Sequence, residues 1–146
     1  MTDNVEIVEV EPGDARLDAV FPVIQELRTH LDRGQFDRLY EAAHPQGYRV
    51  AALFEGDKCR AVAGYRLYTN LFRGKQLYID DLVTSEQSRS NGYGRALNTY
   101  LRDRARSSDC DSLQLDSALH RADAHRFYFR ERYKIRSFHF ESVLDD

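Results

Sequence analysis

Hydrophobic and polar positions follow a helical spacing in the first third of the chain. An apolar stripe runs from Leu17 to Leu31, and a second helical pattern covers Phe36 to Ala43. Pro22, inside the first stripe, is expected to mark a break or a first helical turn rather than the middle of a helix. A β-branched run from Val5 to Val10 precedes both helices and ends at a Pro-Gly-Asp turn, so it predicts an opening strand.

From Tyr48 onward the period changes to two, which is typical of strands. Residues 48–55 and 58–69 flank Gly56-Asp57, and this arrangement predicts a hairpin. Residues 76–84 predict a third strand of this group, which carries the adjacent acids Asp80 and Asp81.

The remaining pattern predicts a helix, a strand, a short helix and a last strand. Apolar residues recur at helical spacing from Tyr93 to Leu101, and residues 113–116 read as a strand. Residues 124–128 predict a short helix, and residues 135–143 a terminal strand. The resulting order, β-α-α-β-β-β-α-β-α-β, is typical of a mixed α/β (α+β) fold. We therefore expect one domain over residues 1–146, with a sheet covered by helices.

Composition narrows the class of protein. The 146 residues contain 21 Lys and Arg against 24 Asp and Glu, a net charge of -3, which argues against a nucleic-acid partner. No apolar run approaches the roughly 18 residues that cross a bilayer, and the acidic N-terminal segment is unlike a signal peptide. Cys59 and Cys110 lie far apart without ligand neighbours, which predicts reduced thiols and no metal site. We expect a cytoplasmic protein without a membrane partner.

The most informative stretch is the loop between Thr84 and the helix at Tyr93. Gly92 and Gly94 open that helix, whose first N–H groups are unpaired and carry roughly half a positive charge. Glycines let an anion approach the backbone, so the pattern predicts a phosphate or pyrophosphate site. A simple tight turn is an equally open interpretation of the two glycines alone. The P-loop motif and the third glycine of a dinucleotide fingerprint are both absent.

Two motifs carry a resemblance to a known family. Arg89-Ser90-Asn91-Gly92-Tyr93-Gly94 resembles the Gln/Arg-x-x-Gly-x-Gly/Ala signature of the GNAT superfamily of N-acetyltransferases. Ala124-His125-Arg126-Phe127-Tyr128 is similar to the second motif of that family, in which a helix carries a tyrosine near the acetyl thioester. The order of elements matches from about Val5 to Phe140. The resemblance implies a central mixed, mostly antiparallel sheet flanked by helices.

The resemblance implies acetyl-CoA as co-substrate. Its pyrophosphate would lie on the backbone of the loop, with Arg89 and Arg95 adding positive charge at the rim. The loop residues in question are Ser90, Asn91, Gly92, Tyr93, Gly94 and Arg95. The pantetheine arm would pair with the open strand backbone at Leu82, Val83 and Thr84. The sheet is expected to separate between this strand and the strand at 113–116, leaving a cleft for the thioester.

Amide formation needs a neutral amine, and a carboxylate at the cleft can help to supply it. An alkyl amine with a pKa near 10 is only about one part in a thousand neutral at pH 7, a cost of roughly 4 kcal/mol. Asp80 and Asp81 are the candidates. Strict alternation favours Asp80, which then shares a face with Leu82 and Thr84, and a bulge would reverse this choice. A salt bridge or a turn cap is the alternative role for either residue.

Tyr128 is the candidate proton donor to the departing CoA thiolate. A backbone N–H near Leu82 or Val83 would stabilise the oxyanion, and no covalent enzyme intermediate is required. Periodicity alone favours a core tyrosine beside Phe127 and Phe129. The resemblance to the family motif reverses this choice.

The sequence thus predicts an N-acetyltransferase that transfers an acetyl group to a primary amine by direct attack in a ternary complex. Acidic residues near the cleft favour a cationic acceptor, either a small amine or a protein amine. Arg121 stands where the family often has Asn, and Arg132-Tyr133 where it has Gly-Phe. The first departure keeps open a non-catalytic or weakly catalytic acyl-CoA sensor; a nucleotide-binding domain of another kind is a third hypothesis. A homodimer and a monomer are both open.

Overall fold

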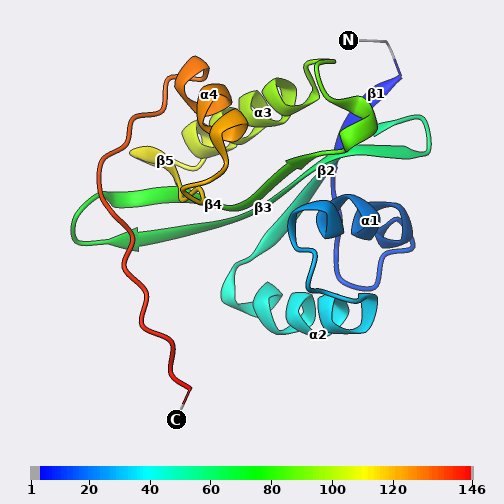
Figure 1. Cartoon of the computed structure of the whole chain (residues 1–146), viewed down its shortest axis with the longest axis horizontal. Helices are drawn as coiled ribbons and strands as arrows, with labels where there is room; N and C mark the ends of the chain where they lie inside the picture. The colour runs from blue at the N-terminus through cyan, green and yellow to red at the C-terminus, as the bar shows by residue number, and fades with distance from the viewer. Residues whose placement is uncertain (1–3, 146) are drawn as a thin grey trace. The chain divides into compact units, whose positions relative to one another are not determined.

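Five strands form one sheet in the order β1-β2-β3-β4-β5 (Figure 1). The strands are β1 (Val5–Glu9), β2 (Arg49–Glu55), β3 (Lys58–Asn70), β4 (Gly74–Thr84) and β5 (Ser112–Leu115). Strands β1 to β4 pair antiparallel, whereas β5 runs parallel to β4. The predicted mixed, mostly antiparallel sheet is therefore confirmed. The computed structural model describes residues 4–145, which divide into two compact units, one ending at Leu115 and the other beginning at Asp116.

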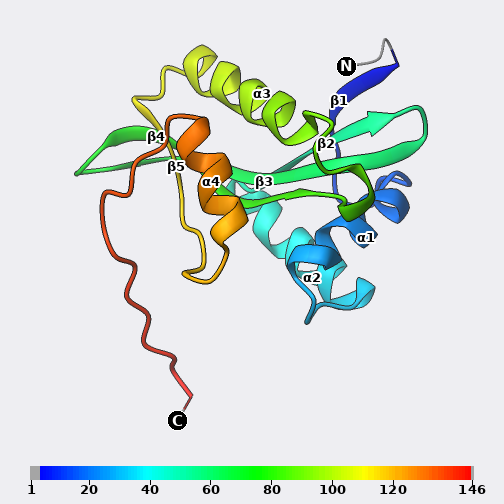
Figure 2. The same cartoon turned by 45° about the horizontal axis from the view of Figure 1, so that its top comes forward.

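Helices cover both faces of this sheet. Helices α1 (Leu17–Leu27) and α2 (Arg33–Ala43) pack on one face, and α3 (Tyr93–Ser107) packs on the other (Figures 1 and 2). Two short 3₁₀ turns, η1 (His44–Gln46) and η2 (Glu86–Ser88), lie in the connections. Because both faces are covered, consecutive residues of β2 are buried on opposite sides of the sheet. Ala52 belongs to the core under α1 and α2, and Ala51 belongs to the core under α3.

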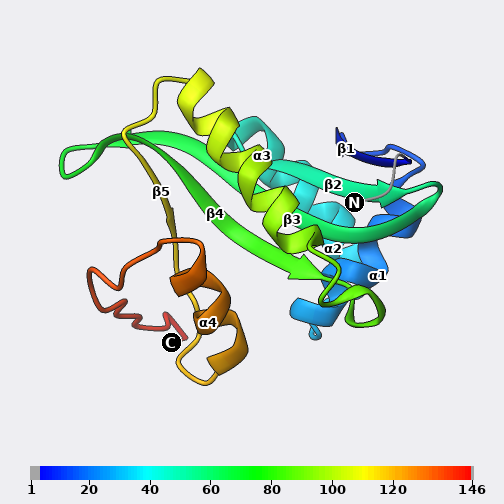
Figure 3. The ribbon, with the colours of Figure 1, turned by 90° about the horizontal axis from the view of Figure 1, so that it is seen from above.

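Helix α3 follows the predicted amphipathic pattern and holds the loop that precedes it. Its buried residues recur every fourth position, as Tyr93, Leu97 and Leu101, and pack with Leu77 and Ile79 of β4. Full burial of a leucine side chain contributes roughly 1.5–3 kcal/mol, so this face fixes the helix firmly. Seen from above, α3 crosses the central strands (Figure 3). Its N-terminus is thereby held next to the end of β4.

The expectation for Pro22 is wrong, because this residue lies inside α1. A helical proline removes the hydrogen bond to the carbonyl four residues earlier, here that of Asp18. Pro22 is exposed while its neighbours Phe21 and Val23 are buried, so water can solvate that carbonyl. The apolar stripe of α1 can therefore remain continuous across the proline.

Strand β4 contains a bulge at the adjacent acids. Tyr65 of β3 pairs with Ile79 and Gly64 pairs with Asp81, which leaves Asp80 as the extra residue. Such an insertion shifts the alternation of side chains by one position. Ile79 accordingly lies in the core under α3, whereas Val83 lies in the core under α1 and α2. The bulge decides which acid faces α1 and α2.

The second unit contains one helix, α4 (Ala122–Arg130), within its described residues. The strand predicted over residues 135–143 is wrong, since residues 134–145 are exposed and have no strand assignment. Alternating apolar residues hold a strand only when a neighbour supplies backbone hydrogen bonds and covers one face. No strand of the described chain pairs with this segment. Among residues 4–145, no helix has the length and apolar content needed to cross a bilayer.

Candidate functional site

A cavity of about 340 Å³ opens between the sheet and the connection from α1 to α2. This is within the size range of sites for small molecules. Its wall combines apolar and aromatic side chains with a small number of polar ones. The lining residues are Ile24, Arg28, His30, Leu31, Phe36, Leu39, Tyr40, Ala43, Tyr48 and Asp81. All of them belong to the first compact unit.

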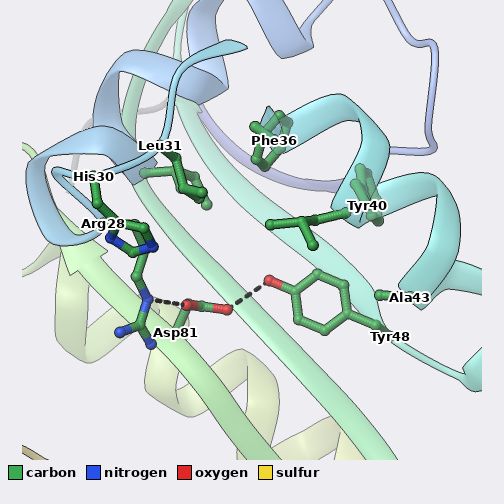
Figure 4. Close-up of a pocket in the computed structure, with 10 residues that line it drawn as sticks. Arg28, His30, Leu31, Phe36, Tyr40, Ala43, Tyr48 and Asp81 are labelled. Atoms are coloured by element: carbon green, nitrogen blue, oxygen red, sulfur yellow. Dashed lines mark hydrogen bonds and ion pairs between the residues drawn. The ribbon is translucent and has the colours of Figure 1, made fainter. Parts of the chain in front are cut away.

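Asp81 lies in this cavity between two partners (Figure 4). The Tyr48 phenol donates to Asp81 Oδ2 at 2.6 Å, and Arg28 Nε donates to Asp81 Oδ1 at 2.8 Å. Only 13% of the Asp81 side chain is exposed. These two contacts fix the orientation of the carboxylate.

Asp80 has a different environment, although it is the next residue along the strand. Its carboxylate accepts two hydrogen bonds from Arg66, at 2.7 Å from Nε and 2.9 Å from Nη2. Asp80 is not among the residues that line the cavity. The bulge thus reverses the choice that strict alternation favoured: Asp81 faces the cavity, while Asp80 forms the salt bridge that was its alternative role.

The Tyr48 phenol is held in its protonated form. Burial, together with the negative charge of Asp81, raises the pKa of Tyr48 well above its ordinary value. The phenol therefore donates a hydrogen bond to Asp81 across the whole physiological pH range. Its ring packs edge-on against Tyr40, with the centroids 5.8 Å apart, and the Tyr40 hydroxyl in turn donates to the carbonyl of Val10.

Gly64 provides the space in which Tyr48 and Asp81 meet. A Cβ atom at Gly64 would lie 1.8 Å from Tyr48 Oη and 2.6 Å from Asp81 Oδ2. Both distances are far below van der Waals contact, so no residue with a side chain fits without moving this pair. The φ angle of Gly64 is not positive, so backbone conformation does not require a glycine here. The close approach of Tyr48 and Asp81 is what requires it.

The loop before α3 is open at the positions of the predicted pyrophosphate site. Its residues 89–92 are exposed, and the N-cap, Gly92, provides no side-chain hydrogen bond to the helix. Gly92 has φ of 80°, and a Cβ there would meet nothing within 4 Å. Ser90 has φ of 72°, a conformation that is rare for non-glycine residues and is found at ligand-binding turns. The geometry fits an anion held by backbone N–H groups.

The first side chain of α3 and two side chains at the end of β4 are packed in the cores. Tyr93 is buried in the core under α3, so only its backbone is available at the helix start. Leu82 and Val83 point into the cores on opposite faces, which leaves their backbone at the strand edge. The pairing of β4 with β5 ends at Ile79 and Leu115. Beyond this point, β4 continues through residues 80–84 with β3 on its other side.

Tyr128 lies on α4 in the second unit. Its ring packs against Phe127 and Tyr133, with centroids 5.6 Å away in each case. Burial raises the pKa of Tyr128, and the neighbouring positive charge of Arg121 offsets part of that rise. The phenol is consequently protonated at neutral pH and can act as a proton donor. The residue that departs from the family pattern, Arg121, thus contacts the tyrosine of the second motif.

Neither cysteine has the properties of a nucleophile. Cys59 and Cys110 are both free, and burial raises the pKa of Cys59 to about 12. The pKa of Cys110 is also raised, mainly by burial. Both thiols are protonated at neutral pH, whereas a nucleophilic cysteine reacts as the thiolate. Within residues 4–145, no group of three His, Cys, Asp or Glu side chains is arranged to hold a metal ion.

Sequence reasoning missed the surroundings of Asp81. Arg28 and Tyr48 are distant from it in the chain, and no motif marks either of them. Gly64 carried a usable signal, because a glycine inside a strand pattern indicates a bulge or a close approach.

Comparison with known proteins gives matches along most of the chain. Residues 16–132 match the acetyltransferase (GNAT) family. An uncharacterized N-acetyltransferase of Bacillus subtilis, YhdJ, is 39% identical over 109 residues, which cover 74% of this chain and 77% of the relative. An aminoalkylphosphonate N-acetyltransferase of Salmonella typhimurium is 35% identical over 66 residues, covering 45% and 43%. The structure of glucosamine-6-phosphate N-acetyltransferase from Arabidopsis thaliana shares the fold, with a TM-score of 0.77, 19% identity and coverage of 98% and 100%.

Proposed function

We propose, from the premise that this chain belongs to the GNAT family of acetyltransferases, that it moves an acetyl group from acetyl-CoA to a small primary amine held in the Asp81 cavity. The chain is an N-acetyltransferase. The proposal concerns the co-substrate, the acceptor site and the residues that act. Transfer occurs by direct attack in a ternary complex.

One observation carries the proposal: two features of β4 lie at adjacent residues. Pairing with β5 ends at Ile79, and the bulge that turns Asp81 toward the cavity follows at the next residue, Asp80. An acyl chain lying along the exposed edge of β4 would therefore end beside the cavity that holds the acid. This coincidence supports a site in which thioester and amine meet.

Acetyl-CoA supplies the activated acetyl group as a thioester. The loop before α3 is suited to its pyrophosphate, because residues 89–92 are exposed and no side chain caps the helix. Arg89 adds positive charge at the rim. The backbone of Leu82, Val83 and Thr84 is suited to the pantetheine amides, which can pair with a strand edge.

Asp81 prepares the amine. A bound ammonium group has to lose a proton before its nitrogen can attack, and this costs roughly 4 kcal/mol at pH 7 for an ordinary alkyl amine. The Asp81 carboxylate receives that proton directly or through water, while Tyr48 holds the other side of the carboxylate. Arg28, which contacts Asp81 at 2.8 Å, has to yield part of that contact to the amine.

Tyr128 donates a proton to the sulfur as the thiolate leaves. The raised pKa of its phenol supports this role, since the proton remains available at neutral pH. Protonated Cys59 and Cys110 favour direct transfer over an acyl-cysteine intermediate.

The proposal includes one N-acetyltransferase domain over residues 1–146. The family match over residues 16–132 supports this, because it extends across both compact units. A cytoplasmic location is supported by the two free cysteines, which suit a reducing compartment. Homodimerisation is supported by the exposed apolar side chains of the C-terminal segment, among them Phe138 and Phe140.

The test is release of CoA from acetyl-CoA in the presence of a panel of amines, with the acetylated product identified by mass spectrometry. We expect release that depends on the amine and that falls about 100-fold or more in Asp81→Asn. Calorimetry with CoA alone measures cofactor binding separately. Binding without turnover on any amine would instead support the acyl-CoA sensor, and absence of binding would contradict the cofactor site.

A further inference from the structure

The charged groups of the cavity indicate what kind of amine it accepts. Arg28 and Asp81 both line the cavity and contact each other at 2.8 Å, so opposite charges lie side by side on one wall. A simple ammonium ion that approaches Asp81 meets the Arg28 guanidinium as well. Repulsion between the two cations opposes its binding, although Asp81 attracts it.

Arg28 is also anchored independently of Asp81. Its Nη2 donates to the backbone carbonyl of Asp80 at 2.8 Å, and its backbone N–H donates to the carbonyl of Ile24 at 2.9 Å. The guanidinium therefore keeps its place when Asp81 turns to another cation. Its hydrogen bonds to residues 4–145 use Nε and Nη2, which leaves Nη1 for a further acceptor.

The cavity also has an apolar side, which lies away from Asp81. Leu31 and Phe36 line it, with Leu39 at the exposed rim. Figure 4 shows Leu31 and Phe36 on the side of the cavity where α1 and α2 approach each other. His30, two residues after Arg28, also lines the cavity.

Resting on the proposed function, we infer that the acceptor is zwitterionic: a primary amine with an anionic group, carboxylate or phosphonate, a few bonds away and an apolar substituent. The ammonium group replaces the Arg28 Nε hydrogen bond at Asp81, and the anion binds the guanidinium, which stays anchored on the Asp80 carbonyl. Each charge of the cavity then keeps a partner of opposite sign. The apolar substituent lies against Leu31 and Phe36, and Arg28 becomes a specificity-determining residue.

The experiment compares acceptors that share one apolar substituent and differ in the anion. L-leucine carries the carboxylate, L-leucinamide replaces it by a neutral amide, and 3-methylbutylamine lacks it. A phosphonate analogue, 1-amino-3-methylbutylphosphonate, distinguishes the two anions. The amine of leucinamide is the least basic and so the most readily deprotonated. A preference for leucine over leucinamide therefore reports recognition of the anion and not amine reactivity.

For the wild type we expect that kcat/KM on L-leucine or on its phosphonate analogue exceeds kcat/KM on both leucinamide and 3-methylbutylamine, which lack the anion. Arg28→Gln should lower this value about 10- to 100-fold, mainly through KM, since it removes a hydrogen bond to a charged group. The same variant should lower kcat/KM on 3-methylbutylamine much less than on the zwitterion, because this amine has no anion to lose its partner and only the support that Arg28 gives to Asp81 is removed. Arg28→Lys should restore part of the zwitterion activity, because it keeps the charge but not the planar pair of donors.

Two outcomes overturn the inference while leaving the proposed function intact. One is a wild type that acetylates 3-methylbutylamine or leucinamide better than both zwitterions. The other is an Arg28→Gln variant that loses activity equally on all acceptors, which would make Arg28 a structural partner of Asp81. If no amine of either kind is acetylated although CoA binds, it is the proposed function that fails.

Discussion

Replacing Gly64 by alanine gives the most direct test of the site geometry. The new Cβ would lie 1.8 Å from Tyr48 Oη and 2.5 Å from Tyr48 Cζ. Because ordinary contact begins at 3.4 Å, the phenol has to move by about 1.6 Å. A shift of this size breaks the 2.6 Å hydrogen bond to Asp81. Since φ of Gly64 is not positive, alanine adds no backbone strain and the effect is steric alone.

The expected cost follows from two contributions. Overpacking of a well-filled site costs about 1–3 kcal/mol, and loss of a hydrogen bond to a charged group costs about 1.5–3 kcal/mol. The two overlap, so we expect Gly64→Ala to lower the free energy of unfolding by about 2–5 kcal/mol. For a chain of this size, that corresponds to a fall in Tm of roughly 5–15 °C. Thermal unfolding followed by circular dichroism measures it.

Activity separates this effect from simple destabilisation. At a temperature where Gly64→Ala is still folded, kcat/KM for the amine should fall while CoA affinity stays close to that of the wild type, because Asp81 loses its fixed orientation. Tyr48→Phe removes the hydrogen bond without adding a Cβ and should give a smaller loss of stability. Gly34→Ala is the matched control: Gly34 lies in α2 with no neighbour closer than 3.4 Å, so the change should be neutral or slightly stabilising.

A Gly64→Ala protein with wild-type Tm and wild-type amine kinetics would refute this reasoning. It would show that Tyr48 and Asp81 do not form their hydrogen bond in the space next to Gly64.

The remaining predictions address the acid, the tyrosine and the loop. Asp81→Asn should lower kcat/KM for the amine about 100-fold or more, whereas Asp80→Asn should mainly lower the stability of the fold. A larger loss of kcat/KM in Asp80→Asn than in Asp81→Asn would show that the bulge does not decide the catalytic acid. Tyr128→Phe should reduce kcat about 100-fold with unchanged CoA affinity by calorimetry, and loss of CoA binding would make Tyr128 a packing residue. Gly92→Val should abolish CoA binding in calorimetry. Gly13→Val is the control, because Gly13 has a similar φ and equally open surroundings: it should destabilise the fold to a comparable extent and leave CoA binding intact.

The sequence alone determined most of the elements in the first unit and the loop that opens α3. These depend on local properties: the period of apolar residues, the turn at Gly56-Asp57, and glycines at the start of a helix. Such properties act between neighbours in the chain, so the pattern of residues is sufficient to reveal them. The pattern of residues was misleading at two places. At Pro22, water can solvate the carbonyl that loses its hydrogen bond, so the helix continues. At residues 135–143, apolar residues alternate but no neighbouring strand pairs with them.

Tertiary structure alone decided which of the two adjacent acids lines the cavity and which side chains it contacts. Asp80 and Asp81 are chemically identical neighbours, and only the register between β3 and β4 turns one of them toward the cavity. Arg28 and Tyr48 contact Asp81 although they lie 53 and 33 positions away from it in the chain. Contacts at such separations result from packing of the whole sheet and its helices, because no local periodicity encodes which distant side chains share a cavity.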